Sequence, residues 1–153
     1  MTRRVLTGDE VSLARSIFGD AINYDTVSIN ARKYWLLQPR RVTMAPNGSI
    51  WFHPKSGIYC DDFCSAHVSD QGLFVHEMVH VWQHQQGIFL PLARHPFCRY
   101  DYAIRPGWTL KRYGIEQQAE IVRHYFMLRQ GLSIVGAPPI ETYEAILPFA
   151  PAR

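Results

Sequence analysis

Apolar residues recur at helical spacing in three stretches of the chain, and runs with strand-like alternation or turn residues separate these stretches. Thr7 and Glu10 have the spacing of a capping box and stand just before the first stretch, so we predict a helix at residues 8–18. Polar and apolar residues then alternate in three short runs. These runs predict strands at residues 26–29, 41–44 and 49–53.

Two longer helices are predicted in the second half of the chain. Ser69 or Asp70 is placed to cap the first of them, at residues 71–86. The second begins at residue 110 or 115, has an apolar stripe every three or four residues, and ends at residue 130. The hydrophobic pattern breaks at residues 55–66, where we predict a surface loop. Proline and glycine predict a mostly irregular segment at residues 88–108. We expect one further turn of helix at residues 141–146.

This order of elements, a helix, a few strands and then two long helices, is typical of an α+β fold. We find no repeat and no linker-like segment, and the length suits one domain, so we expect residues 1–153 to form a single domain.

The composition excludes several classes of protein. Apolar residues make up 47% and aromatic residues 13%, which is too much apolar surface for a disordered chain. The net charge is only +3 and the basic residues are scattered, so we expect no nucleic-acid partner. No apolar run reaches the roughly 18 residues that a membrane-spanning helix needs.

The first residues carry Arg3 and Arg4, but no apolar segment follows them, so they do not form a secretory signal. We expect a protein made in the cytoplasm, with any export dependent on a secretion system. The odd number of cysteines argues against a disulfide framework and favours free thiols, although a disulfide formed after export and a zinc site remain alternatives: Cys60, Cys64 and Cys98.

The strongest candidate chemistry is the motif His-Glu-Met-Val-His at residues 76–80, inside the first long helix. His76 and His80 stand one helical turn apart, so both imidazoles face one cation. Catalytic zinc has three protein ligands and one water, whose pKa the metal lowers to about 7. Glu77 lies beside that helix face, where its carboxylate can take a proton from this water.

A third ligand must come from another element. His84 stands one turn further along the same helix, and a rise of about 5.4 Å per turn places it too far away. Glu116 and Glu120 share one face of the second long helix. We assign Glu116 to the metal and Glu120 to the free ring N–H of a ligand histidine. The reverse assignment remains open.

The motif together with the two glutamates resembles the gluzincin branch of the zincin metallopeptidases, in which a glutamate on a later helix is the third ligand. More narrowly, residues 42–44, 49–52 and 74–83 resemble a bacterial domain found with contractile injection systems, and the metallopeptidase domains attached to type VI secretion spike proteins. The resemblance covers residues 20–130. It implies a zincin-like fold, with a small, mostly antiparallel sheet packed on the two long helices that carry the metal site.

The resulting hypothesis is a zinc metallopeptidase in which Glu77 is the general base and a peptide or protein is the substrate. The resemblance implies a secretion-system effector whose partners are a spike protein or an immunity protein, and it implies that an extended peptide pairs with residues 49–53. Three residues are candidates for a second donor to the oxyanion: Tyr113, His124 and Tyr125.

Two alternatives use the same residues. One is a zinc-containing binding or adaptor module without turnover, and the other is a hydrolase of peptidoglycan amides. Glu77 argues against the first, because a structural zinc normally has four protein ligands and needs no general base. The sequence does not choose between protein and cell-wall substrates.

Overall fold

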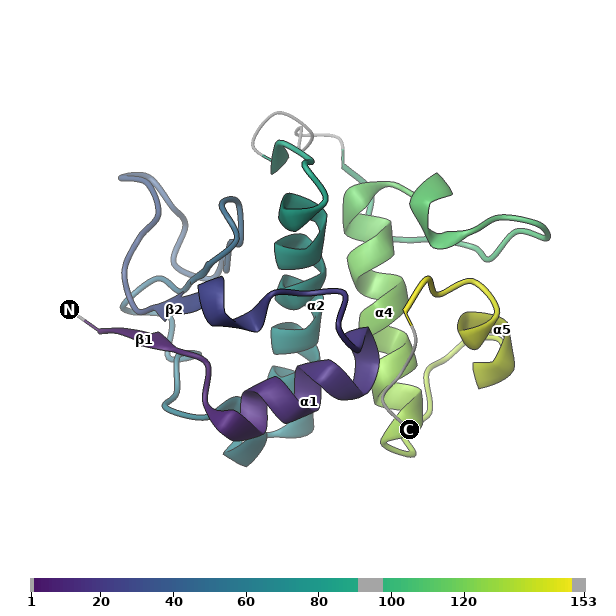
Figure 1. The fold of residues 1–153 in the computed structure, drawn as a ribbon, viewed down its shortest axis with the longest axis horizontal. Coiled ribbons are helices and arrows are strands. Elements are labelled where there is room, and N and C mark those ends of the chain that lie inside the picture. The colour runs from purple at the N-terminus through teal and green to yellow at the C-terminus, as the bar shows by residue number, and fades with distance from the viewer. Residues whose placement is uncertain (1, 91–97, 150–153) are drawn as a thin grey trace.

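Two adjacent helices form the centre of the molecule in a computed structural model, which describes residues 2–90 and 98–149 (Figure 1). Helices α2 (Val68–Gln85) and α4 (Ile115–Arg129) pack side by side and run in opposite directions. The small sheet lies on the free side of α2, and α5 (Ile140–Glu144) packs against α4 on the other side. The described residues thus form an α+β arrangement, as predicted.

The first helix, α1 (Gly8–Phe18), has the predicted bounds because its N-terminal cap is encoded locally. The Thr7 hydroxyl accepts a hydrogen bond from the Glu10 N–H at 3.0 Å, and the Glu10 carboxylate accepts one from the Thr7 N–H at 2.9 Å. Glu10 is fully buried, and Arg4 donates two hydrogen bonds of 2.8 Å to it. This pair ties the first strand to α1 without leaving a buried charge unpaired.

The sheet has three strands in the order β1 (Arg3–Val5), β2 (Ser28–Asn30), β3 (Ile50–Trp51). Strands β1 and β2 are antiparallel, whereas β2 and β3 are parallel. The expected mostly antiparallel sheet is therefore corrected to a mixed one. Parallel pairing is possible here because the long connection between β2 and β3 returns the chain to the same end of the sheet.

The strand bounds differ from the prediction for local reasons. The strand expected at 26–29 starts at Ser28, because Tyr24–Thr26 forms a 3₁₀ turn before it. The expected strand at 41–44 is absent, since the Val42 N–H bonds to the Pro39 carbonyl in a turn. Only Met44 keeps a β-bridge, to Trp51.

The long helices were predicted with small errors at their ends. Helix α2 begins three residues early because His67 caps it, its Nδ1 accepting from the Ser69 N–H at 3.2 Å. Leu110–Arg112 forms a separate 3₁₀ turn before α4. Of the expected loop at 88–108, residues 91–97 lie outside the described part, and residues 98–108 form turns and irregular structure.

The core fills the space between the sheet, α1 and the two central helices. Phe52, Phe63 and Phe74 stack in series, with ring centroids 5.3 and 5.6 Å apart. Burial of such aromatic rings is a large favourable contribution to folding. The described helices include none that is both long enough and apolar enough to cross a membrane.

Candidate metal centre

Helices α2 and α4 bring three side chains of metal-ligand type together. His76 and His80 lie one turn apart on α2, with ring centroids 5.1 Å apart. Glu116, in the first turn of α4, places its Oε2 atom 3.3 Å from His76 Nε2 and 3.2 Å from His80 Nε2. All three side chains are buried, and their possible ligand atoms lie within 4.8 Å of one another. This group could hold a metal ion.

The other ring nitrogen of each histidine faces an acceptor. Gln83 Oε1 lies 2.8 Å from His80 Nδ1. Glu120 Oε1 lies 3.0 Å from His76 Nδ1, although the approach is too oblique for a well-formed hydrogen bond. Both acceptors favour a proton on Nδ1, so Nε2 of each ring, which faces Glu116, is the nitrogen that would bind a metal ion once it carries no proton.

Gln83 also fixes the position of α4 relative to α2. Its amide group donates to the Ile115 carbonyl at 3.0 Å and to Gln118 Oε1 at 3.1 Å. The same buried side chain therefore orients one histidine and holds the helix turn that carries Glu116.

Glu77 directly follows His76 on α2, where its charge acts on that histidine, and it is 4% exposed. Its Oε2 atom is buried and has no hydrogen-bond partner among the described residues. An unpartnered buried carboxylate oxygen is costly, so it indicates a functional rather than a stabilising role. Two imidazole nitrogens and one carboxylate oxygen are the donor set of catalytic zinc sites, and the residues present fit that metal.

The electrostatics of the cluster favour a cation at its centre. Burial by itself lowers the pKa of His76, but the Glu116 and Glu120 carboxylates outweigh this effect and raise the pKa to about 9. Burial alone would raise the pKa of Glu116, yet the two histidines lower it well below its ordinary value, and His76 likewise lowers the pKa of Glu120. The carboxylates therefore stay ionised.

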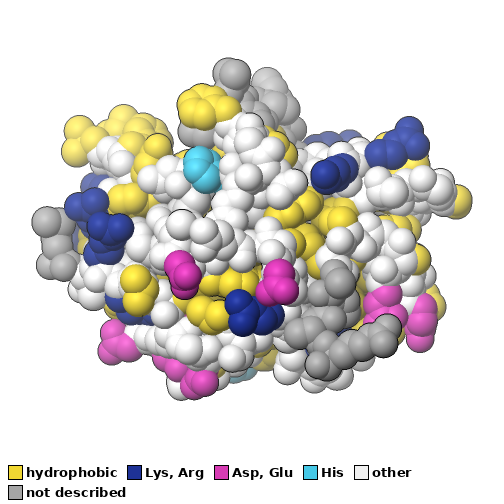
Figure 2. All heavy atoms as spheres, viewed as in Figure 1, with side chains coloured by type: hydrophobic (Ala, Val, Ile, Leu, Met, Phe, Trp, Pro, Cys, Tyr) yellow, Lys and Arg dark blue, Asp and Glu magenta, His cyan; other side chains and the backbone are white. Residues whose placement is uncertain are grey.

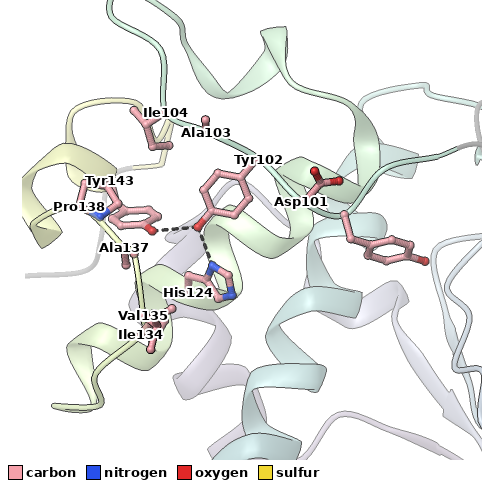
Figure 3. A pocket seen from close by; sticks show the side chains of 12 residues that line it. Asp101, Tyr102, Ala103, Ile104, His124, Ile134, Val135, Ala137, Pro138 and Tyr143 are labelled. Carbon is pink, nitrogen blue, oxygen red and sulfur yellow. Dashed lines mark hydrogen bonds between the residues drawn. The ribbon is translucent and has the colours of Figure 1, made fainter.

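A line of polar contacts leads from Glu120 into a pocket of about 440 Å³ (Figure 3). Glu120 Oε2 lies 3.5 Å from His124 Nε2, and His124 Nδ1 lies 2.6 Å from the Tyr102 hydroxyl. Figure 3 shows this hydroxyl between His124 and Tyr143, 2.8 Å from the second phenol. Burial raises the pKa of Tyr102, so its hydroxyl keeps its proton.

A second hollow borders the start of α4. Its volume is about 520 Å³, and Glu116 lines its wall together with Cys98, Lys111 and Gln117. The ring of Tyr100 stacks nearly parallel to that of His76, with centroids 6.2 Å apart and planes inclined by 15°. Tyr100 is 44% exposed, so an exposed aromatic ring adjoins the buried cluster.

The three candidate oxyanion donors have other contacts, and their role stays a prediction. The Tyr113 hydroxyl accepts from the Arg105 N–H at 2.9 Å, and Tyr125 is buried beneath the guanidinium of Arg129. Both ring nitrogens of His124 face the partners described above. The structure thus offers no direct support for any of the three.

The remaining residues singled out in the sequence are His84, the sheet edge at residues 49–53 and the cysteines. His84 is exposed and contacts Gly48. The outward-facing N–H and C=O of Trp51 both bond to Met44, at 2.7 and 3.1 Å, so this part of the sheet edge is not open to a peptide. Cys60 and Cys64 are free thiols, and burial raises the pKa of Cys64 to about 12.

Gln83 and Tyr100 contact the histidines of the cluster, and Tyr102 is linked to it through His124 and Glu120, but none of the three was predicted from the sequence. Gln83 had a usable signal, because it follows His80 by three residues and shares its helix face. The tyrosines stand in an irregular segment with no periodicity, so nothing local linked them to the histidines.

The fold and the cluster define the protein as an α+β domain with a buried His-His-Glu group. No family model matches the chain. It is 44% identical over 133 residues to the type VI secretion system spike protein VgrG2b of Pseudomonas aeruginosa, an alignment that covers 81% of this chain and 13% of that protein. The solved effector domain of the same VgrG2b matches with a TM-score of 0.77 and 41% identity, covering 83% of this chain and 75% of that domain.

The chain therefore belongs to the family of the VgrG2b effector domain. This confirms the resemblance to domains attached to type VI secretion spike proteins. The chain spans only 13% of the length of the spike protein that it matches.

Proposed function

We propose that the protein is a zinc-dependent metallopeptidase in which His76, His80 and Glu116 hold the metal and Glu77 is the general base. One observation carries the proposal: Glu116 Oε2 faces both Nε2 atoms, while the buried Glu77 Oε2 beside them has no partner. A zinc ion bound there would supply a Lewis acid that lowers the pKa of water to about 7 and polarises a carbonyl oxygen.

The chain's own residues supply the proton transfer and its geometry. Glu77 takes a proton from the attacking water at its buried carboxylate and passes this proton to the departing amine. Glu120 and Gln83 keep the two imidazoles oriented, so little reorganisation is needed during the reaction. A substrate would approach through the hollow that Glu116 lines, and the exposed Tyr100 ring, which stacks on His76, would contact it.

The test compares Glu77→Gln with the wild type in hydrolysis of a protein substrate by the zinc-loaded chain. The amide cannot accept a proton, so we expect turnover to fall about 10²- to 10⁴-fold while zinc content stays equal. Glu144→Gln, at an exposed position of α5, is the matched control and should keep full activity. Undiminished hydrolysis by Glu77→Gln contradicts the proposal.

The same comparison, made with a protein and with peptidoglycan as substrates, distinguishes the metallopeptidase from an adaptor module and from a peptidoglycan hydrolase. A zinc-containing adaptor would bind the metal but cleave neither protein nor peptidoglycan. A peptidoglycan amide hydrolase would release cell-wall fragments in a Glu77-dependent reaction and leave proteins intact.

We further propose that the protein acts as an effector of a type VI secretion system, associated with a spike protein and restrained by an immunity protein. The support is the effector domain of VgrG2b, which this chain matches over most of its length. We expect the protein in the medium of cells with an intact apparatus and not in the medium of cells that lack its sheath. Equal release by both would contradict this role.

A further inference from the structure

The connection between β2 and β3 presents apolar side chains to solvent. Yellow side chains gather at the upper left of Figure 2, where this connection extends away from the helices in Figure 1. The exposed fractions are 39%, 47%, 82% and 71% for four consecutive residues: Tyr34, Trp35, Leu36 and Leu37. A contiguous exposed apolar patch of this kind marks an interaction site. We call residues 32–41 the apolar loop.

The apolar loop is held in this exposed shape by one buried side chain. Gln38 is 3% exposed; its Oε1 accepts from the Tyr34 N–H at 2.7 Å, and its amide donates to the Val42 carbonyl at 2.8 Å. The Gln38 N–H also bonds to the Trp35 carbonyl at 3.1 Å, which closes a turn. Residues 35–37 therefore form the tip of an ordered turn, and their exposure is built into the fold.

Positive charge is concentrated around this tip. Residues 26–60 contain no Asp or Glu, whereas the rest of the chain has 11 basic and 13 acidic residues and a net charge of −2. The segment has five basic side chains, all of them exposed: Arg32, Lys33, Arg40, Arg41 and Lys55. Residues 26–60 thus carry a net charge of +5, although the net charge of the whole chain is only +3.

We propose that the apolar loop binds the surface of an anionic phospholipid bilayer. Trp35, Leu36 and Leu37 would enter the interface, and the surrounding cations would contact the lipid phosphates. Tryptophan and tyrosine suit this depth because each joins an apolar ring to a polar group. Along the chain, Arg32 and Lys33 precede the exposed apolar residues 34–37 and Arg40 and Arg41 follow them, so one negative surface would meet both the apolar and the cationic side chains. The binding is peripheral and does not depend on the metal cluster.

The test uses the full chain and flotation with lipid vesicles. We expect binding to phosphatidylcholine vesicles that contain phosphatidylglycerol, weaker binding to pure phosphatidylcholine, and loss of binding as salt increases. The double variant Leu36→Ser, Leu37→Ser should bind more than about ten-fold more weakly, because two apolar side chains no longer leave water. Val135→Ser, at a fully exposed site outside the loop, is the control and should bind like the wild type.

Two further measurements keep the proposal falsifiable. The charge variant Lys33→Gln, Arg41→Gln should lose affinity for the anionic vesicles, and Arg3→Gln, Lys111→Gln, which removes two exposed cations elsewhere, should lose less. Brominated acyl chains should quench the fluorescence of Trp35, and Trp35→Phe should remove that quenching. Absence of binding to the anionic vesicles, or equal binding by the folded double leucine variant, overturns the proposal and points instead to a protein partner.

Discussion

At the scale of single residues, the two histidines of the cluster are held by chemically different neighbours. A neutral amide, Gln83, faces His80, whereas a carboxylate, Glu120, faces His76. A carboxylate acceptor raises the basicity of the imidazole more than an amide does. We therefore expect the side chain of Glu120 to strengthen metal binding through His76 without contacting the metal.

The two glutamates of α4 should respond differently to truncation. Glu116→Ala removes a ligand oxygen that faces both Nε2 atoms, so the purified protein should contain almost no zinc. Glu120→Ala leaves the ligands in place and should weaken zinc binding about 10- to 100-fold. Competition with a fluorescent chelator measures both. The opposite order of effects would show that the two roles are reversed.

Zinc binding should release a proton near neutral pH. In the metal-free protein the pKa of His76 is about 9, raised by Glu116 and Glu120 against the effect of burial, so its imidazole is protonated at pH 7. Metal must displace that proton, and the apparent affinity should increase about ten-fold per pH unit up to about pH 9. Calorimetry in buffers of different ionisation enthalpy counts the protons. If zinc binding released no proton at pH 7, the prediction that His76 is protonated in the metal-free protein would be wrong.

At the scale of elements, the turn before β3 is fixed against α2 at a glycine. Gly48 has φ = +82°, and a Cβ atom there would lie 2.8 Å from Cδ2 of His84. The backbone conformation disfavours any other residue, and the approach to α2 leaves little room for a side chain.

Gly48→Ala should therefore lower stability by more than about 1 kcal/mol, which corresponds to a fall in Tm of a few degrees. Gly57→Ala is the matched control, because Gly57 also has a positive φ of 75° but has open space around it. We expect Gly57→Ala to lose less, and the additional loss in Gly48→Ala to vanish in a His84→Ala background. Equal losses in all backgrounds would show that the contact with α2 is unimportant.

An element can be predicted from the sequence when its stabilising contacts are between residues close together in the chain, and it is missed when they are between distant residues. Helix α1 was predicted to the residue because Thr7 and Glu10 satisfy each other within one turn. The strand expected at 41–44 does not form, because both backbone polar groups of Val42 are bonded within a turn. Its N–H donates to the Pro39 carbonyl, and its carbonyl accepts from the Gln38 side-chain amide. The parallel pairing of β3 with β2 depends on a connection of about twenty residues, and no local pattern encodes its path.

At the scale of the whole molecule, the cluster connects the two central helices. His76 and His80 belong to α2 and Glu116 to α4, so a metal ion would cross-link residues far apart in the sequence. The motif on α2 could be identified from sequence because its spacing is local. The choice of Glu116 rested on helix periodicity and a family resemblance, and the neighbouring tyrosines of residues 100–102 gave no signal at all.

Removal of the metal should destabilise the molecule. At a free zinc concentration of about 100 times Kd, binding adds about 2.7 kcal/mol to the free energy of unfolding, so a chelator should lower Tm by roughly 5–10 °C. Differential scanning calorimetry with and without chelator measures the shift. Glu116→Ala should show almost no shift, and a wild-type Tm that is insensitive to chelator would contradict a metal cross-link.

The most direct measurement of the central claim is an anomalous difference map recorded at the zinc absorption edge from crystals of the zinc-loaded chain. We predict one strong peak at about 2.0–2.2 Å from His76 Nε2, His80 Nε2 and a carboxylate oxygen of Glu116, with Glu77 beside it and not bonded to it. A peak elsewhere, or none at the three side chains, would contradict the claim.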